Sequence, residues 1–159
     1  MPGRKVIFFN RSFYPDITAC AQLLTELCES LVKDFGYQVT VIAGRPRVKE
    51  NNSMRAWLAG KIIAKENFKG IEIIRIKNTV FSHKSFLGRI SNYLSYFFLS
   101  FLAIFQVKRP DLIITLTDPP IIGLVGFFAS RWFKAPFLIS VKDVFPEAAL
   151  GLDSRQNKL

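Results

Sequence analysis

Polar side chains of the kinds that bind ligands gather in three short segments of an otherwise apolar chain. The first segment runs from Arg11 and Ser12 through Tyr14 and Asp16 into a predicted helix. The first backbone N–H groups of a helix have no intrahelical partner, so this segment is suited to bind an anion. Asp16 or Thr18 can also simply cap the helix, and the two roles are compatible.

The other two segments carry acids. Residues 117–120 (TDPP) form an acidic turn in which two prolines hold Asp118 in place, although turn chemistry alone also accounts for an aspartate before proline. In residues 140–153 (SVKDVFPEAALGLD), Asp143 closely follows an apolar run, and Glu147 comes one helical turn later. Both acids can instead cap a following helix.

Hydrophobic patterning predicts the elements that position these segments. Short apolar runs bounded by polar residues predict five strands, at 5–10, 38–43, 71–76, 112–116 and 137–141. Between them, helical spacing predicts helices at 22–35, 85–107 and 121–133. Strands that alternate with helices imply right-handed crossovers and a mainly parallel sheet. The predicted fold class is therefore α/β, a doubly wound domain of the Rossmann type.

The predicted strand order, 3-2-1-4-5, brings the three polar segments together. They follow strands 1, 4 and 5, which are neighbours in this order, and ligands of such folds bind outside the carboxyl ends of the strands. An acid placed directly after a buried strand at this crevice favours a functional role for Asp143. Within the first helix, Leu23, Leu27, Leu31 and Phe35 are four residues apart and share one face, and Gly36 ends the helix.

Composition sets the outer limits. The chain has 159 residues, of which 50% are hydrophobic, and this length suits one domain with a real core. The net charge of +10 points to an anionic partner, whether a phosphorylated small molecule, an acidic lipid surface or nucleic acid. Cys20 and Cys28 offer neither a disulfide framework nor a metal site, and both are expected to be buried thiols. The glycine signatures of NAD-binding and P-loop proteins are absent from the sequence.

The sequence also raises the question of membrane contact. Residues 90–107 form an 18-residue, largely apolar stretch, but polar residues interrupt it, and a crossing would put the predicted strands on opposite sides of the bilayer. The first residues lack the long apolar run of a signal peptide. We therefore expect a cytoplasmic protein, peripheral at the inner face of the cytoplasmic membrane, with a basic segment at 45–69. The predicted membrane contacts are Trp57, Lys61, Lys65, Phe97 and Phe101; the alternative is ordinary core and solvated surface.

Three stretches resemble a known enzyme family. RSFYPDITACAQLLTELCESL (11–31), TDPPIIGLVG (117–126) and VKDVFPEAALGL (141–152) are similar to the N-terminal half of family 4 glycosyltransferases of the GT-B fold, in particular the subgroup that builds bacterial surface polysaccharides. The stretches occur in family order and at family spacing. The resemblance implies that residues 1–152 form the acceptor-side Rossmann-like domain and that 153–159 are a truncated tail or linker. The C-terminal donor-binding domain would be absent.

The resemblance also implies an activity. Family enzymes move a sugar from a nucleotide-sugar donor to a polysaccharide or lipid-linked saccharide acceptor with retention of configuration, and they need no cofactor and no bound metal. This chain would be an incomplete half of such a hexosyltransferase, inactive alone, with the missing domain supplied in cis or in trans. The alternatives are one subunit of a split enzyme, or a non-catalytic membrane-docking or scaffolding module. A nucleic-acid binder is disfavoured, because no recognition helix or aromatic RNA-binding pattern is present.

Site residues follow from the same resemblance. Asp143 is predicted to be catalytic, orienting or deprotonating the acceptor hydroxyl. The chain departs from the family at Lys142, where relatives carry Gln, Arg or His, and at Ala21, where the subgroup often has Gly and where a Cβ can hinder close approach to a phosphate. The residues expected to line the cleft between donor and acceptor are Arg11, Tyr14, Asp16, Thr18, Ala19, Asp118, Lys142 and Glu147.

Overall fold

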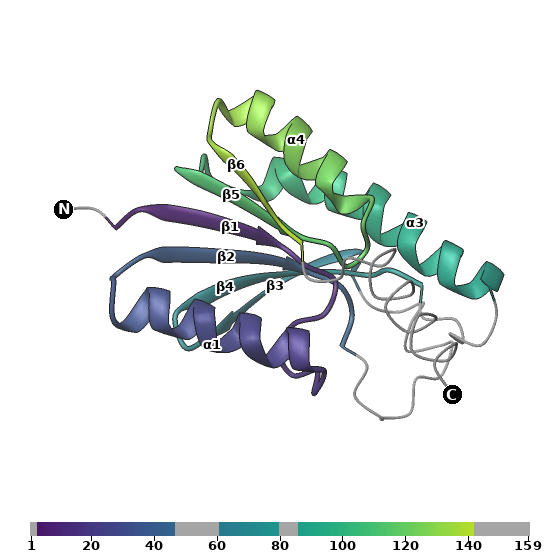
Figure 1. Ribbon diagram of the computed structural model, residues 1–159, viewed down its shortest axis with the longest axis horizontal. Coiled ribbons are helices and arrows are strands. Elements are labelled where there is room, and N and C mark those ends of the chain that lie inside the picture. Colours follow the sequence, from purple (N-terminus) through teal and green to yellow (C-terminus); the bar gives the residue numbers. More distant parts are fainter. Residues whose placement is uncertain (1–2, 47–60, 80–85, 142–159) are drawn as a thin grey trace, which may run out of the picture.

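The computed structural model describes residues 3–46, 61–79 and 86–141, and within these ranges the chain forms a six-stranded sheet with helices on both faces (Figure 1). The elements in chain order are β1 (Lys5–Phe9), α1 (Ala19–Lys33), β2 (Gln38–Ala43), β3 (Ile63–Phe68), β4 (Ile71–Ile76), α3 (Phe86–Ala103), the short 3-10 helix η1 (Ile104–Gln106), β5 (Leu112–Leu116), α4 (Ile122–Phe133) and β6 (Phe137–Ser140).

The strand order confirms the predicted doubly wound sheet. The order is β3-β4-β2-β1-β5-β6, and every neighbouring pair is parallel except β3 and β4. Without β3, this is the 3-2-1-4-5 order that the sequence predicts. Each of the five predicted strands is present, and none of their boundaries differs by more than one residue.

The antiparallel edge strand β3 corrects the sequence analysis, which treated 45–69 as an irregular basic segment. The strand forms a two-residue hairpin with β4 through Lys69 and Gly70, whose φ angles are +50° and +84°. Positive φ at both central residues is the geometry that fits the twist of a tight hairpin. The strand, IAKENF, escaped prediction because three of its residues face solvent and it lacks the apolar run of a buried strand.

Two cores cover the two faces of the sheet. Val6 and Phe8 of β1 point toward α1, whereas Ile7 and Phe9 point toward α3 and α4. Successive side chains of a strand point to opposite faces, so strands buried on both sides must be apolar throughout. Figure 1 shows this layering, with α1 on one face and α3 and α4 together on the other.

Helix α1 buries a different face from the one that the leucine pattern indicates. Ala21, Leu24, Thr25 and Cys28 are the buried residues, whereas Leu23, Leu27 and Phe35 are between 49% and 66% exposed. The residues of α1 that face the sheet are mostly small. A search for large apolar residues four positions apart therefore does not find this buried face. Cys28 is buried as expected, but Cys20 is partly exposed.

The long apolar segment at 85–107 is confirmed as a helix that packs on the sheet. Helix α3 buries Tyr96 completely, and the Tyr96 hydroxyl donates a hydrogen bond of 2.8 Å to the Ile42 carbonyl at the end of β2. In the part of the chain that the structure describes, no helix has the length and apolar character needed to cross a membrane.

Candidate functional site

The candidate site lies where β1 and β5 end side by side in the middle of the sheet. Helix α1, which follows β1, packs on one face, and α4, which follows β5, packs on the other (Figure 1). The two connections leave the sheet in opposite directions, so the carboxyl ends of these strands flank the crevice where ligands of doubly wound folds bind. The predicted cleft residues Arg11 and Asp118 follow β1 and β5 at this point.

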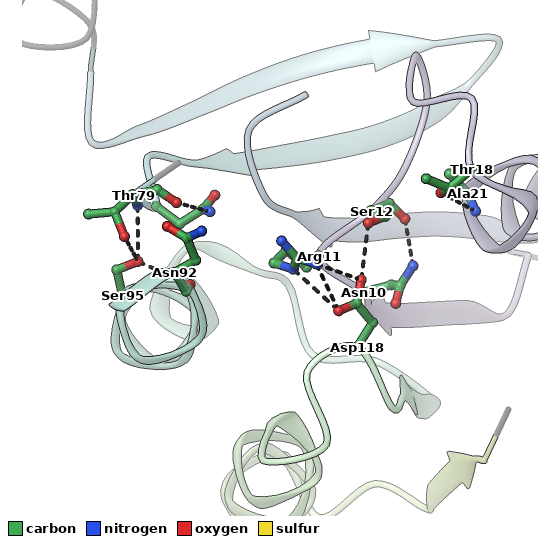
Figure 2. Close-up of polar contacts among 10 residues, drawn as sticks. Asn10, Arg11, Ser12, Thr18, Ala21, Thr79, Asn92, Ser95 and Asp118 are labelled. Atoms are coloured by element: carbon green, nitrogen blue, oxygen red, sulfur yellow. Dashed lines mark hydrogen bonds and ion pairs between the residues drawn. The ribbon is translucent and has the colours of Figure 1, made fainter. Parts of the chain in front are cut away.

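Arg11 and Asp118 join the two strand ends through an ion pair (Figure 2). The guanidinium donates from Nη2 to both carboxylate oxygens, at 3.0 and 3.3 Å, and from Nε to Oδ1 at 3.3 Å. The Ser12 hydroxyl donates to Asp118 Oδ2 at 3.0 Å, and the Arg11 backbone N–H donates to the Asp118 carbonyl at 3.1 Å. Both carboxylate oxygens accept hydrogen bonds, and the Arg11 side chain is only 9% exposed. Asp118 therefore holds the loop after β5 against the loop after β1, and it is poorly placed to act as a base.

Two tyrosines of α3 lie close to this pair. The Arg11 Cζ is 5.2 Å from the centre of the Tyr93 ring, within the range of a cation–π contact. Burial raises the pKa of the Tyr96 phenol, and the charge of Asp118 raises it further, whereas the nearby Ser100 hydroxyl and the charge of Arg11 lower it. Since the burial effect is the largest, Tyr96 remains protonated and acts as a hydrogen-bond donor near the site.

Asn10 and Gly44 complete the support beneath the ion pair, and the sequence analysis missed both. Asn10 is fully buried; its Nδ2 donates to the Ser12 carbonyl at 2.5 Å, and its Oδ1 has no hydrogen-bond partner among the described residues. The Gly44 N–H donates to the Arg11 carbonyl at 2.9 Å, and a Cβ at Gly44 would lie 2.9 Å from the Arg11 side chain and 2.8 Å from Asn78 Oδ1. In the sequence, the feature that could have revealed Asn10 was the position of an amide residue directly after the buried strand KVIFF.

Arg75 is the other supporting residue that the sequence analysis missed. It lies on β4, is 6% exposed, and donates to the carbonyls of Gly44 and Tyr14 and to the Glu66 carboxylate of β3. The Tyr14 ring also stacks on Phe68 of β3, with 3.8 Å between ring centres. These contacts fix the loop between β1 and α1 to the far half of the sheet. The signal that could have revealed this role was an arginine within the largely apolar strand IEIIRI.

A second polar cluster joins the ends of β2 and β4 to α3 (Figure 2). Asn78 Oδ1 accepts from the Arg45 N–H at 2.9 Å. Asn78 Nδ2 donates to the Thr79 carbonyl at 2.9 Å, a contact drawn beside the labelled Thr79 in Figure 2. The Thr79 N–H in turn donates to the Ser95 hydroxyl of α3 at 3.0 Å. The carboxyl edge of the sheet is therefore lined with polar contacts from β4 to β5.

The remaining described cleft residues lie between β1 and α1. Thr18 is the N-cap of α1, and its hydroxyl accepts from the Ala21 N–H at 3.4 Å (Figure 2), so the capping role is real. Tyr14, Thr18 and Ala19 are exposed, and Asp16 is buried. Ala21 is fully buried, and its methyl group therefore packs inside the domain and does not obstruct the cleft.

Several predicted site residues lie outside the described ranges. They are the catalytic candidate Asp143, the cleft candidates Lys142 and Glu147, and the membrane candidate Trp57. Their roles stay predictions. Among the residues that are described, no three His, Cys, Asp or Glu side chains are grouped so that they could hold a metal ion. The expected absence of a cofactor likewise stays a prediction.

The predicted membrane contacts that the structure describes lie in different surroundings, and their role at a membrane stays a prediction. Phe97 and Phe101 are only partly exposed and pack against the core, because their positions on α3 turn toward the sheet. Lys65 pairs with Glu72 at 3.2 Å and donates to the Gln106 carbonyl, which compensates part of its charge. Lys61 is also exposed, and it makes no ion pair with any of the described residues.

Comparison with known proteins shows the fold. No family model and no curated protein sequence match this chain. Among solved structures, the chain is similar to the catalytic domain of starch synthase IV from Arabidopsis thaliana bound to ADP and acarbose, with a TM-score of 0.59 and 9% sequence identity. The match covers 89% of this chain and 34% of that one, so the chain spans about a third of its neighbour's length.

This likeness defines the class of fold. The starch synthase is a glycosyltransferase of the GT-B fold, and the mostly parallel six-stranded sheet described above is a Rossmann-like half of that architecture. At 9% identity the likeness concerns the fold alone. It does not show membership of glycosyltransferase family 4 or of its bacterial subgroup, which stays a prediction.

Proposed function

We propose that this chain forms one Rossmann-like half of a glycosyltransferase. The observation that carries the proposal is the Arg11–Asp118 pair, which organises two loops at the point where the strand order reverses. An exposed helix N-terminus, at Thr18 and Ala19, follows one of these loops. Such a terminus attracts a phosphate group, as a nucleotide-sugar donor would offer. The neighbour with this fold is a starch synthase bound to ADP and acarbose, which supports the same chemistry.

In this proposal each loop has its own task. The loop from Arg11 to Thr18 faces the donor diphosphate, and the ion pair with Asp118 keeps it in place while substrates exchange. Asp143, three residues beyond the end of β6, orients or deprotonates the acceptor hydroxyl. Lys142 and Glu147 contribute to the same wall of the cleft. Transfer retains configuration, and the acceptor is a polysaccharide or a lipid-linked saccharide.

The proposal includes a second domain. Arg11 and Asp118 satisfy one another, so Arg11 is not available as a cationic clamp for a pyrophosphate. We propose that a donor-binding half, in cis or in trans, supplies this clamp, and that the 159-residue chain is inactive alone. Detectable sugar transfer by the purified chain would contradict this part of the proposal.

The test of the catalytic role is an Asp143→Asn variant of the protein together with its donor-binding half. Incorporation of sugar from a panel of radiolabelled nucleotide-sugars into a membrane lipid extract is measured. We expect the variant to lose a factor of about one hundred or more in transfer rate, because the amide cannot accept the hydroxyl proton. The matched control is Asp34→Asn, at the far end of α1, which should retain full activity.

Two results would overturn the proposal. An unchanged transfer rate in the Asp143→Asn variant would show that Asp143 has no catalytic role. Failure of every nucleotide-sugar to react, with the complementing half present, would favour a non-catalytic module. That second candidate function is supported by the exposed apolar side chains of α3 and α4.

A further inference from the structure

Helices α3 and α4 carry large apolar side chains on the face that points away from the sheet. On α3, Leu94, Phe98 and Leu102 are four residues apart, and on α4 the same spacing separates Leu124, Phe128 and Trp132. These six side chains are between 41% and 67% exposed. Residues four apart lie on one side of a helix, so each helix presents a continuous apolar stripe.

The two stripes form one surface. Helices α3 and α4 lie side by side over the same face of the sheet (Figure 1). Phe105, just after α3, meets Trp132 with 5.7 Å between ring centres, and Phe101 meets Phe128 at 5.5 Å. A shallow groove of about 300 Å³ runs between the helices; it is lined by Phe101, Ile104, Phe105, Phe128, Ala129, Arg131 and Trp132. We call this surface the α3/α4 face.

The charged side chains carried by α3, α4 and the residues that flank them are all positive. Neither 86–110 nor 121–140 contains an Asp or a Glu. Arg89, Lys108, Arg109, Arg131 and Lys134 are all exposed. Because α3 and α4 both run antiparallel to the strands, the last four of these cations lie at one end of the face, near Phe105 and Trp132. The acids Glu26, Glu29 and Asp34 belong to α1, on the opposite face of the sheet.

We propose that the α3/α4 face docks on an anionic phospholipid surface, with both helices lying in the plane of the interface. Exposed Trp and Phe beside Lys and Arg are the residues that insert at the headgroup level of a bilayer. A second copy of the chain would cover the apolar stripes but bring like charges together, which disfavours that contact. Anionic headgroups neutralise the same cations. This inference is independent of the proposed sugar transfer.

The first experiment reports on the face without altering it. In a Trp57→Phe background of the 159-residue chain, Trp132 is the sole tryptophan. Its fluorescence is followed as vesicles of phosphatidylcholine, or of phosphatidylcholine with about one third phosphatidylglycerol, are added. We expect a blue shift with the anionic vesicles and quenching when their acyl chains carry bromine. Binding without a change in Trp132 emission would overturn the proposal.

The second experiment removes the apolar and basic parts separately. Phe98→Ala with Phe105→Ala should lower the vesicle partition coefficient tenfold or more. Lys108→Ala with Arg109→Ala should lower it about fivefold for each cation, and only on anionic vesicles. The matched control is Lys33→Ala with Phe35→Ala, an exposed cation and an exposed aromatic at the end of α1, and it should bind as the parent does.

Circular dichroism is used to check that each variant is folded. The quenching of Trp132 tests the proposal without any substitution in the α3/α4 face, so it does not depend on the folding of the variants. Equal binding of the parent to neutral and anionic vesicles would overturn the proposal. So would a dimer, seen by sedimentation without vesicles, that Phe105→Ala dissociates, since a second copy would then be the occupant of this face.

Discussion

At the scale of the residue, the polar side chains of the candidate site mainly fix one another. Arg11, Asp118 and Ser12 form a closed set of hydrogen bonds, and Arg75 fixes the same loop from the other side. Side chains that are already paired cannot move freely toward a ligand, so the loop geometry is set before any substrate arrives. Preorganisation of this kind is what a cleft for a charged ligand requires.

The strength of the ion pair gives the first prediction at this scale. Asp118→Asn removes the charge opposite a nearly buried Arg11, and we expect the free energy of unfolding to fall by about 2 kcal/mol, less than for a fully buried pair because Asp118 is one-third exposed. Urea denaturation measures the change. Glu72→Gln, which breaks the exposed pair with Lys65, is the control and should cost at most about 1 kcal/mol. Equal losses in the two variants would contradict a structural role for Asp118.

The two cysteines give a second prediction. Burial raises the pKa of the Cys28 thiol from 9.0 to about 12, whereas Cys20 is partly exposed. Iodoacetamide at pH 8 should therefore alkylate Cys20 and leave Cys28 unmodified in the folded chain, and mass spectrometry distinguishes the two sites. Equal labelling of both thiols would show that Cys28 is accessible.

The same shift has a consequence for stability. The thiol is harder to ionise in the folded state than in the unfolded state. Its contribution to the free energy of unfolding is therefore complete below pH 9.0, and it is lost as the pH rises toward about 12, because only the unfolded chain ionises readily in that range. A Cys28→Ala variant should lack this part of the alkaline loss of stability.

At the scale of the element, glycines decide how closely the loops approach. Gly44→Ala would place a Cβ within 3.0 Å of Asn78 and Arg11, so either the loop after β2 or the loop after β1 must shift. We expect a loss of about 1–3 kcal/mol in the free energy of unfolding. Gly123→Ala on α4 is the control, because its Cβ would meet only Ile139 of β6, at 3.5 Å. The better helix propensity of alanine should leave stability unchanged or raise it by up to about 1 kcal/mol. If both variants were equally stable, the approach at Gly44 would not be tight.

At the scale of the whole molecule, the two proposals concern different surfaces. The candidate site lies at the carboxyl edge of the sheet, whereas the α3/α4 face belongs to the helices that cover one side of the sheet (Figure 1). Each proposal can therefore fail alone. Vesicle binding without sugar transfer would describe a docking module, and transfer without vesicle binding would describe an enzyme whose acceptor does not require this face to meet a membrane.

Patterns in the sequence were enough to predict the five parallel strands of the sheet and their order, though not the edge strand β3. Runs such as KVIFF and LIITL must be buried on both faces, because no alternation of apolar and polar residues marks a solvent side, and strands of this kind separated by helices permit few topologies. The strand order in turn predicted that Arg11 and Asp118 would follow neighbouring strands. Their separation of 107 positions did not hide the relation, because the topology placed both at one edge.

Only the tertiary structure decided which apolar residues are core and which are surface. Leu23 and Leu27 are as apolar as Leu24, and Phe98 is identical in type to Phe97, yet each helix turns one set inward according to the shape of the sheet beneath it. The structure also showed that Arg75 crosses the sheet edge to the loop after β1, a contact between positions 61 residues apart. Such choices depend on how side chains from distant segments fit in space, and no local pattern in the sequence records that fit.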